Sequence, residues 1–401
     1  MTMFRKSVLC RISLVLSLMF ILISCSSKTS NSNNATSLRV NRERVLLVQR
    51  TGNVGYFFWS PDGTKLIYVI CWMTDGCQQQ DVMLVDLKEA EKNAKKVNAQ
   101  GPIDCGPWVK WSFDSKKILI LNRGGIAFRS YLFDIETNTQ EQLPVPENWV
   151  TFYEDYSPVA NMIVCNAVYV KKGDKVGEVL DVHPWRLATI DLDKNQFKFI
   201  PTNTAAQGEP FLAHWSLDGK NIGYCASKFG IESGKGKCYS LNLSTGEVYI
   251  PNYYDNSSES THRSSYEYRS LGVWEKEGIE ILGKYGQRNG KYYGAWAFKM
   301  DGSGKMWRLT DSLEGEAPSF YYKEVFSPDL RFVADVYVKE GRTYFRIREL
   351  KTGKQKLLDA YLQLPDEKCP IAWSPDGKSV CYLAKDSNSI YPVIMLATIE
   401  E

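Results

Sequence analysis

The sequence predicts an all-β protein, a seven-bladed β-propeller of four-stranded antiparallel blades. One observation is a turn motif, Trp-Ser-Pro-Asp-Gly, which occurs at residues 59–63 and again at 373–377. A second is that degraded copies fill the interval between these two, at a spacing of about 50 residues. The third is that apolar, strand-like segments follow most copies, such as 66–69 and 380–383. This repeat indicates a propeller, because one small sheet buries both of its faces only when neighbouring sheets stack on it.

The degraded copies keep the leading aromatic residue and part of the turn. They lie at residues 111–115, 156–158, 215–219, 274–278 and 326–329. In the intact motif Pro presets the backbone of a tight turn, Asp can bond to the backbone two residues on, and Gly accepts the positive φ that closes the turn. We therefore expect a hairpin turn at each copy, with the aromatic ring packed in the core between adjacent blades.

Each repeat unit is predicted to contain four strands. In the first unit we expect them at 56–59, 66–72, 82–87 and around 96–98. The last unit supplies three strands before the chain ends, so its fourth strand has to come from elsewhere. The apolar run Val45 to Val48 precedes the first unit and is expected to complete the last blade. Such a closure joins the two ends of the chain and removes exposed sheet edges.

The first 25 residues have the pattern of a targeting signal. A positively charged start, with Arg5 and Lys6, precedes an apolar stretch at 12–23 that is short for a membrane span. The segment ends Leu-Ile-Ser-Cys at 22–25, which resembles the lipobox of bacterial lipoproteins. The resemblance implies that the signal is removed and that Cys25 becomes a lipidated N-terminus. The alternative is an ordinary signal peptide with a chance cysteine.

The mature chain is expected to consist of a tether and one folded domain. Residues 26–41 are rich in Ser and Asn and have few apolar residues, which predicts a disordered tether, and residues 42–401 are expected to form the propeller. Ser26, in place of an aspartate, resembles the outer-membrane sorting signal of enteric bacteria. We therefore expect a monomer that is lipid-anchored in the bacterial cell envelope, at the outer membrane and facing the periplasm.

The charge of the chain indicates whether it binds nucleic acid, and its cysteine content indicates the redox state of its cellular compartment. Lys and Arg number 49 against 46 for Asp and Glu, so there is no basic footprint for nucleic acid. The ten cysteines fall to eight once Cys10 and Cys25 are set aside, an even number that suits an oxidising compartment. The sequence leaves their connectivity open, with buried free thiols as the alternative. The candidates for disulfides are Cys71 and Cys77, Cys225 and Cys238, and Cys369 and Cys381.

The turn motif, followed by Lys or Thr and an apolar strand, resembles the PD40 repeat, also called the TolB-like or WD40-like propeller repeat. The resemblance covers residues 44–401 and implies the propeller fold. TolB is similar only in the repeats, because it carries an additional N-terminal domain where this chain has a signal and a tether. The resemblance therefore does not extend to the role of TolB.

Motifs for catalysis are absent from the sequence. It contains neither the Gly-x-Ser-x-Gly of α/β-hydrolases nor the His-Glu-x-x-His of zinc proteases. A stretch that starts like a calcium loop at Asp191 has Gln196 in place of the required glycine and Thr202 in place of the final acid. These observations favour a protein without catalytic activity, although they leave the question open.

Long loops are predicted on one face of the propeller, where the second-to-third and fourth-to-first strand connections emerge. Binding sites usually lie on such loops. The longest, 251–268, holds aromatic and cationic side chains that suit stacking on sugars or peptides; an inserted loop without a ligand is the alternative. The candidate ligand-binding residues are Tyr253, Tyr254, His262, Arg263 and Tyr266.

All three histidines, His183, His214 and His262, are expected toward that same face. Imidazole is a common metal ligand, and oligogalacturonate lyases, whose fold is similar to PD40 propellers, bind a metal with histidines on their propeller. Two hypotheses follow. The first is a non-catalytic, lipid-anchored propeller that binds an envelope protein or glycan and needs no cofactor. The alternative is a carbohydrate-active enzyme with a divalent metal on these histidines, which otherwise are unrelated surface residues.

Overall fold

The structure is a computed structural model, and its chain divides into two units, Met1–Ser37 and Leu38–Glu401. It describes residues 37–47, 53–74, 77–89, 94–97, 109–122, 129–171, 184–202, 209–216, 218–227, 237–249, 266–270, 279–286, 292–299, 306–308, 325–340, 342–359, 371–385 and 392–400. No helix in these ranges has the length and apolar character needed to cross a membrane. The described β-strands all belong to the second unit.

Within the described residues the strands form seven four-stranded antiparallel sheets. Four of them, in spatial order, consist of β2 (Asn53–Trp59), β3 (Lys65–Thr74), β4 (Cys77–Asp86) and β5 (Ala94–Lys96); β6 (Val109–Trp111), β7 (Lys117–Asn122), β8 (Arg129–Asp134) and β9 (Thr139–Gln142); β10 (Trp149–Tyr156), β11 (Met162–Tyr169), β12 (Arg186–Asp191) and β13 (Gln196–Phe199); and β14 (Glu209–Trp215), β15 (Asn221–Ser227), β16 (Lys237–Asn242) and β17 (Val248–Tyr249). Each is a meander of consecutive strands, as the sequence predicts.

Two more sheets repeat this meander, and another takes one strand from the start of the chain. The two consist of β18 (Tyr266–Ser270), β19 (Ile279–Gly286), β20 (Tyr292–Lys299) and β21 (Met306–Arg308), and of β22 (Val325–Phe326), β23 (Phe332–Lys339), β24 (Arg342–Glu349) and β25 (Gln355–Asp359). The sheet that ends the chain has the order β1 (Val40–Leu47), β28 (Pro392–Ile399), β27 (Ser379–Lys385) and β26 (Ile371–Trp373).

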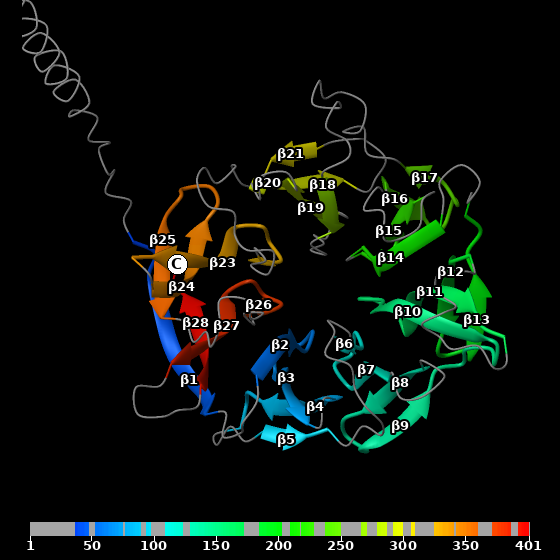
Figure 1. Cartoon of the computed structure of the whole chain (residues 1–401), viewed down its shortest axis with the longest axis horizontal. Coiled ribbons are helices and arrows are strands. Elements are labelled where there is room, and N and C mark those ends of the chain that lie inside the picture. The colour runs from blue at the N-terminus through cyan, green and yellow to red at the C-terminus, as the bar shows by residue number, and fades with distance from the viewer. Residues whose placement is uncertain are drawn as a thin grey trace, which may run out of the picture. The chain divides into compact units, whose positions relative to one another are not determined.

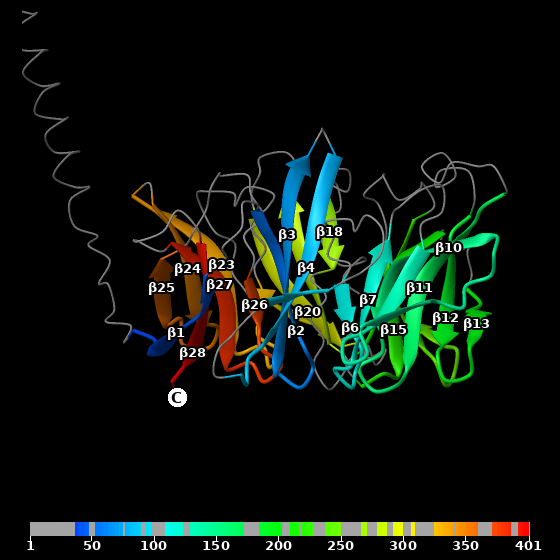
Figure 2. The ribbon, with the colours of Figure 1, turned by 90° about the horizontal axis from the view of Figure 1, so that it is seen from below.

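The sheets of this unit follow one another around a common centre (Figure 1). Strands β2, β6, β10, β14 and β26 lie nearest that centre, and the last strand of each meander lies outermost. We call the four strands of a sheet A to D from the centre outward. Because neighbouring strands are antiparallel, the A–B and C–D connections leave a sheet at one end, the turn end, and the B–C and D–A connections leave it at the other, the loop end (Figure 2).

The turn motif forms the hairpin turns that the sequence predicts. In the first copy Ser60 Oγ donates to Asp62 Oδ1 at 2.6 Å, and Asp62 Oδ1 accepts from Thr64 N at 2.9 Å. The turn closes with a bond from Gly63 N to Ser60 O at 2.9 Å, and Gly63 has a φ of 69°. In the degraded copy at 326–329 the equivalent position is Leu330, with a φ of 57°, a conformation that costs a side-chain-bearing residue about 1–2 kcal/mol.

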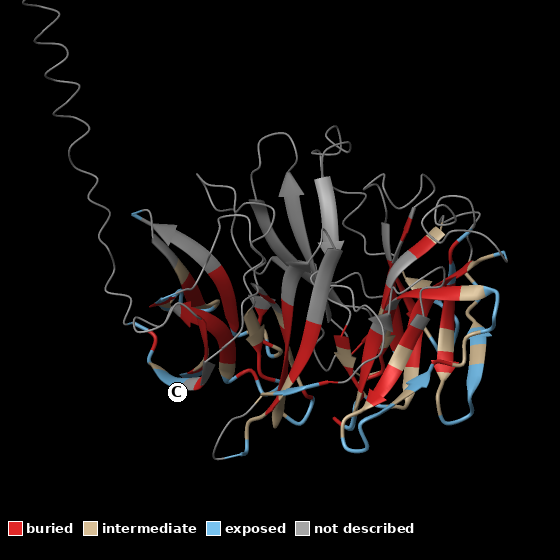
Figure 3. Ribbon diagram, turned by 60° about the horizontal axis from the view of Figure 1, so that its bottom comes forward, coloured by how far each residue is buried: buried red, intermediate tan, exposed pale blue. Residues whose placement is uncertain are grey.

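The core lies between adjacent sheets, and the motif aromatics belong to it as predicted. Buried aliphatic and aromatic side chains form clusters that each draw on two neighbouring sheets. The buried residues follow the strands, whereas exposed residues gather at the turns (Figure 3). The buried motif aromatics are Trp111, Tyr156, Trp215, Phe326 and Trp373. Trp274, which the sequence predicts in the same role, lies outside the described residues.

The motif tryptophans also tie adjacent sheets together through hydrogen bonds. Trp111 Nε1 donates to Phe58 O at 3.1 Å, and Trp215 Nε1 donates to Asp155 O at 3.1 Å. In both cases the accepting carbonyl belongs to the residue directly before the motif aromatic of the preceding sheet. The repeat therefore sets the contact between blades as well as the turn within each blade.

Strand β1 begins before the predicted run of Val45 to Val48. It pairs with β28 from Val40, which lies opposite Ile399, and shows an irregularity between Arg44 and Leu46. The strand thus starts before residue 42, the predicted first residue of the propeller. After Val40 its early part consists of the polar and charged residues 41–44, so a search for consecutive apolar residues misses it. Val48 lies outside the described residues.

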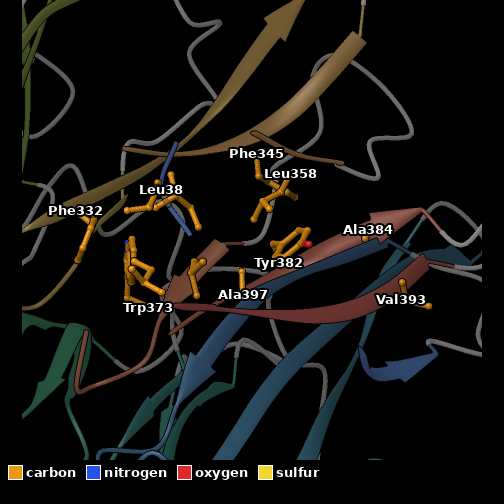
Figure 4. Packing of buried hydrophobic residues seen from close by; sticks show 13 residues of the cluster. Leu38, Phe332, Phe345, Leu358, Trp373, Tyr382, Ala384, Val393 and Ala397 are labelled. Carbon is orange, nitrogen blue, oxygen red and sulfur yellow. The ribbon is translucent and has the colours of Figure 1, made fainter. Parts of the chain in front are cut away.

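Leu38, just before β1, packs in the cluster between the last sheet and the sheet β22–β25 (Figure 4). Its side chain is 7% exposed. Val45, on the other face of β1, is 6% exposed and packs with residues of the first and last sheets. The first described residues of the chain therefore contribute to two separate interfaces between sheets.

Two of the three candidate cysteine pairs are wrong. Cys71 lies opposite Gln80 in the pairing of β3 with β4, and Cys77 lies opposite Thr74, so the two are offset by three positions. At about 3.4 Å per residue this offset alone exceeds the roughly 7 Å that a disulfide can span. Cys381 is a free thiol buried in the middle of β27, and Cys369 lies outside the described residues. Cys225 and Cys238, in contrast, lie directly opposite each other in β15 and β16.

Candidate functional site

The connections at the two ends of the sheets differ in length, as the sequence predicts. At the turn end they are short, as at 60–64 and 374–378. At the loop end they include 170–185, 250–265 and 309–324, so the loop at 309–324, which the sequence analysis did not single out, equals the one predicted to be longest. The loop end is therefore where long connections can present side chains.

Of the predicted ligand-binding residues, the structure describes only Tyr266. Tyr253, Tyr254, His262 and Arg263 lie outside the described residues. Tyr266 is the first residue of β18, opposite Gly286 in β19, and so lies in a strand where the sequence predicts a loop. In the segment Tyr-Glu-Tyr-Arg, aromatic and charged residues alternate, which is typical of a β-strand. The same aromatic residues instead led to the prediction of a binding loop.

The histidine hypothesis also changes. His214 is the penultimate residue of β14, directly before the motif residue Trp215 and the turn that follows it, and so lies at the turn end. The sequence instead predicts His214 toward the face with the long loops. His183 and His262 lie outside the described residues, in connections that join the loop ends of strands. The described residues contain no group of three metal-ligating side chains.

A group of aromatic rings and an arginine lies at the loop end of the sheet β10–β13. The Trp149 and Phe199 ring centroids are 4.6 Å apart, and those of Trp149 and Tyr169 are 5.5 Å apart. The Arg186 guanidinium carbon is 5.6 Å from the Trp149 centroid and 5.2 Å from the Phe199 centroid. We call these four residues, Trp149, Tyr169, Arg186 and Phe199, the Trp149 cluster.

The backbone register explains why these four residues meet. Trp149 opens strand A and lies opposite Tyr169, which ends strand B. Arg186 opens strand C opposite Ala167, and Phe199 ends strand D opposite Ala188. Pairs along these strands differ by two positions, so all four residues share one face of the sheet. The small side chains of Ala167 and Ala188 leave room on that face, which lets large rings from the outer and inner strands approach each other.

The Trp149 cluster is the half-exposed margin of a buried core. Trp149 and Phe199 are partly buried against the cluster between the sheets β6–β9 and β10–β13, whereas Arg186 is exposed. Rings over which a cation is held offer an apolar face for stacking, and the exposed guanidinium can donate to a carboxylate or hydroxyl group. The cluster therefore combines partly exposed aromatic surface with an exposed cation, features that suit contacts with sugars and with planar side chains.

The sequence alone does not reveal this cluster, because its members lie far apart along the chain. The available signal was positional: each of the four residues stands at the predicted loop end of its strand in one repeat unit. That signal becomes useful only when strand ends and register are known, because a shift of one residue would place a side chain on the other face.

Two acidic side chains of β10 connect neighbouring sheets. Asp155 Oδ1 lies 2.9 Å from Lys110 Nζ of β6, and Asp155 Oδ2 accepts from Trp215 N of β14 at 3.0 Å. This carboxylate therefore joins three consecutive sheets. Glu154 Oε1 accepts from Ser130 Oγ of β8 at 2.5 Å. These two carboxylates are thus held in contacts between sheets.

Comparisons with known proteins identify the class of fold. An oligogalacturonate lyase from Vibrio parahaemolyticus aligns with a TM-score of 0.60 at 13% identity, over 91% of this chain and 99% of the other. An oligogalacturonate lyase in complex with manganese aligns with a TM-score of 0.61 at 14% identity, over 91% and 97%. The β-propeller domain of Cps50 (Swd1) from Myceliophteria thermophila aligns with a TM-score of 0.51 at 12% identity, over 90% and 100%. These likenesses show that the chain has a β-propeller fold.

No protein-family model matches the chain, and no curated protein matches its sequence. The PD40 repeat therefore remains a prediction from the motif. TolB from Acinetobacter baumannii also aligns, with a TM-score of 0.38 at 16% identity.

Proposed function

We propose that the chain is a non-catalytic, lipid-anchored protein of the bacterial cell envelope that binds a protein or glycan through its loop end. The Trp149 cluster carries the binding part of this proposal, because it offers stacking faces and an exposed guanidinium at the end of the sheets where the long connections lie. The anchor at Cys25, the tether and the outer-membrane location are supported by the lipobox-like sequence.

The scaffold in this proposal is a closed seven-bladed propeller. Closure is supported by a bond from Trp59 Nε1 in the first sheet to Ala372 O in the last, at 3.1 Å, which repeats the contact made by Trp111 and Trp215 elsewhere. A buried cluster containing Val45 also spans the first and last sheets. In a closed ring each sheet stacks between two neighbours, which holds the loop-end residues in fixed positions.

The proposal that the chain is non-catalytic is supported by the contacts of its acidic side chains in the interior, which are engaged in hydrogen bonds and ion pairs. Asp155 and Glu154 engage partners from other sheets, as described above, which suits a structural role. In a second pair, Arg346 Nε donates to Asp335 Oδ1 at 2.8 Å, and both side chains are buried. Removing one member of such a pair leaves an uncompensated charge and is expected to unfold the protein rather than to alter a reaction.

Photo-crosslinking in cells tests where the partner binds. A benzophenone amino acid is placed at Tyr169 in the Trp149 cluster or, as a matched control, at Phe113, an aromatic residue that is 39% exposed at the turn end. We expect a crosslinked partner from position 169 and none from position 113, and digestion with proteases or glycosidases shows whether it is a protein or a glycan. Equal capture at both positions, or none at position 169, would refute the proposal.

Side-chain variants test the contribution of the cluster itself. Arg186→Ala is expected to lower the yield of that crosslink about tenfold, since a stacked cation and its hydrogen bonds contribute roughly 1–2 kcal/mol. Arg331→Ala is the control, because Arg331 makes a similar contact, 5.0 Å from the Phe332 ring centroid, at the turn end of another sheet. Equal losses in the two variants would indicate a general effect on the fold.

The alternative is a metal-dependent carbohydrate-active enzyme, and the specific observation in its favour is the likeness of the fold to the oligogalacturonate lyase in complex with manganese. Elemental analysis of the purified protein separates the two hypotheses. A stoichiometric divalent metal that is lost in His214→Ala would favour the enzyme. Since His214 lies at the turn end, we expect no metal that depends on it.

A further inference from the structure

The pairing of β15 with β16 brings Cys225 and Cys238 together at a position suited to a covalent bond. The two residues are direct partners in the register, and Cys225 also lies opposite Phe211 of β14, so the pair is in the interior of the sheet. Eight cysteines were expected in the mature chain, and the sequence left their connectivity open. The register now distinguishes this pair from the other candidates.

The hydrogen-bond pattern between β15 and β16 shows whether Cys225 and Cys238 form a hydrogen-bonded or a non-hydrogen-bonded pair of the antiparallel ladder. Leu243 N donates to Lys220 O, which makes the Lys220 and Leu243 positions a hydrogen-bonded pair of the same ladder. Hydrogen-bonded and non-hydrogen-bonded pairs alternate along an antiparallel ladder, so Cys225 and Cys238, five positions further on, form a non-hydrogen-bonded pair. In such pairs the Cα atoms are about 4.5 Å apart, within the range of roughly 4.4–6.8 Å found for disulfides.

The two described free thiols have a different environment. Cys165 and Cys381 are fully buried in hydrophobic clusters of other sheets, and burial raises the pKa of both thiols, which keeps them protonated and unreactive. Neither residue has a cysteine opposite it, since Cys165 pairs with Ala188, and Cys381 pairs with Ala372 and Leu396. These residues therefore serve as internal controls.

We propose that Cys225 and Cys238 form a disulfide that ties β15 to β16 at the base of the loop-end connection 228–236. The bond forms by exchange with a small-molecule or protein disulfide. One cysteine thiolate attacks the oxidant, which breaks its S–S bond, releases its first sulfur as a thiol and leaves a mixed disulfide. The second cysteine thiolate attacks the cysteine sulfur of that mixed disulfide and displaces the other half of the oxidant as a second thiol, so the two protons lost by the cysteines are taken up by the two leaving thiols. The closed loop is short, and the tie restricts the unfolded chain and the ends of both strands.

Peptide mapping of the full-length protein tests the bond directly. The folded protein is incubated with oxidised glutathione, denatured, alkylated without reduction and digested with trypsin. Lys228, Lys235 and Lys237 separate the two cysteines, so peptides 221–228 and 238–263 remain together only through a disulfide. We expect this linked pair, with Cys165 and Cys381 alkylated. Recovery of Cys225 and Cys238 as two alkylated or two separately glutathionylated peptides would overturn the proposal.

Thermal unfolding with and without reductant gives an independent measure. Reduction is expected to lower the wild-type melting temperature by a few °C, as for other disulfides that close short loops. The double variant Cys225→Ser, Cys238→Ser should melt near the reduced wild type and be insensitive to reductant, whereas Cys165→Ser should keep the response. A response that survives in the double variant would assign it to another bond. Because these measurements need no partner, their outcome is independent of the proposed binding function.

Discussion

Deleting β1 tests whether the N-terminal strand closes the ring. The variant lacks residues 38–47 but keeps the predicted anchor at Cys25 and most of the tether. It removes the ladder that β1 forms with β28 and the buried side chains of Leu38 and Val45. It also exposes β28 as an unpaired edge, which favours association with other chains.

The expected loss of stability is large. Burial of an aliphatic side chain contributes roughly 1.5–3 kcal/mol, so Leu38 and Val45 together account for about 3–6 kcal/mol. Each backbone hydrogen bond of the ladder adds about 0.5–1.5 kcal/mol. Since a typical domain is stable by roughly 5–15 kcal/mol, the deletion should remove most of the free energy of unfolding.

Urea unfolding followed by tryptophan fluorescence measures this loss. The control is a deletion of equal length in the predicted tether, residues 27–36, which should leave the urea midpoint unchanged. The β1 deletion should unfold at a much lower urea concentration and aggregate on concentration. Equal midpoints for the two deletions would refute the closure and the seven-blade count. Leu38→Ala alone should cost about 2 kcal/mol or more, because it leaves a cavity between two sheets.

Three further predictions concern the turn motif and the anchor. Leu330→Gly should stabilise the protein by up to about 1 kcal/mol, because Leu330 has a φ of 57°. Gly377→Ala should destabilise it by about 1–2 kcal/mol in the same chemical denaturation assay, because Gly377 has a φ of 69°. Changes of the same sign in the two variants would contradict the role given to φ. Burial raises the pKa of Asp62, but hydrogen bonds from Ser60 and Thr64 lower it overall from 3.8 to about 2, so its contribution to stability is present above pH 3.8 and lost toward pH 2. The wild-type melting temperature should therefore fall more steeply across that range than the melting temperature of Asp62→Asn, and parallel curves would argue against this. Cys25→Ala should leave the protein soluble or unprocessed in membrane fractionation; a variant that stays with the membrane like wild type would overturn the lipobox interpretation.

Much of the fold could be predicted because its turns and strands depend on residues that are close together in the sequence. The Ser, Asp and Gly of the turn at 60–63 bond to one another and to the next residues, so their spacing alone specifies a hairpin. The short alternating or apolar segments between the turns specify strands, and the missing strand of the last unit indicated that the N-terminus would supply it. The start of that strand at Val40 was less clear, because residues 41–44 are all polar or charged.

The candidate site could not be predicted in the same way. The Trp149 cluster depends on the register of four strands. Residues 266–268, predicted as the end of the longest loop, belong to β18, which pairs with β19. His214, which was expected toward the face with the long loops, lies at the turn end because β14 begins five residues before it, at Glu209. Errors of a few residues leave a fold prediction intact but move a side chain to the other face or the other end of a sheet.

The sequence by itself determined the turns, the strands and the order of the blades, since each depends on the backbone preferences of a few consecutive residues. Tertiary structure decided which side chains meet: it placed Cys225 opposite Cys238, set Cys71 and Cys77 too far apart to bond, and let Asp155 join three sheets. The reason is that register and contacts between sheets follow from the packing of many distant residues at once, which no single segment of the chain encodes.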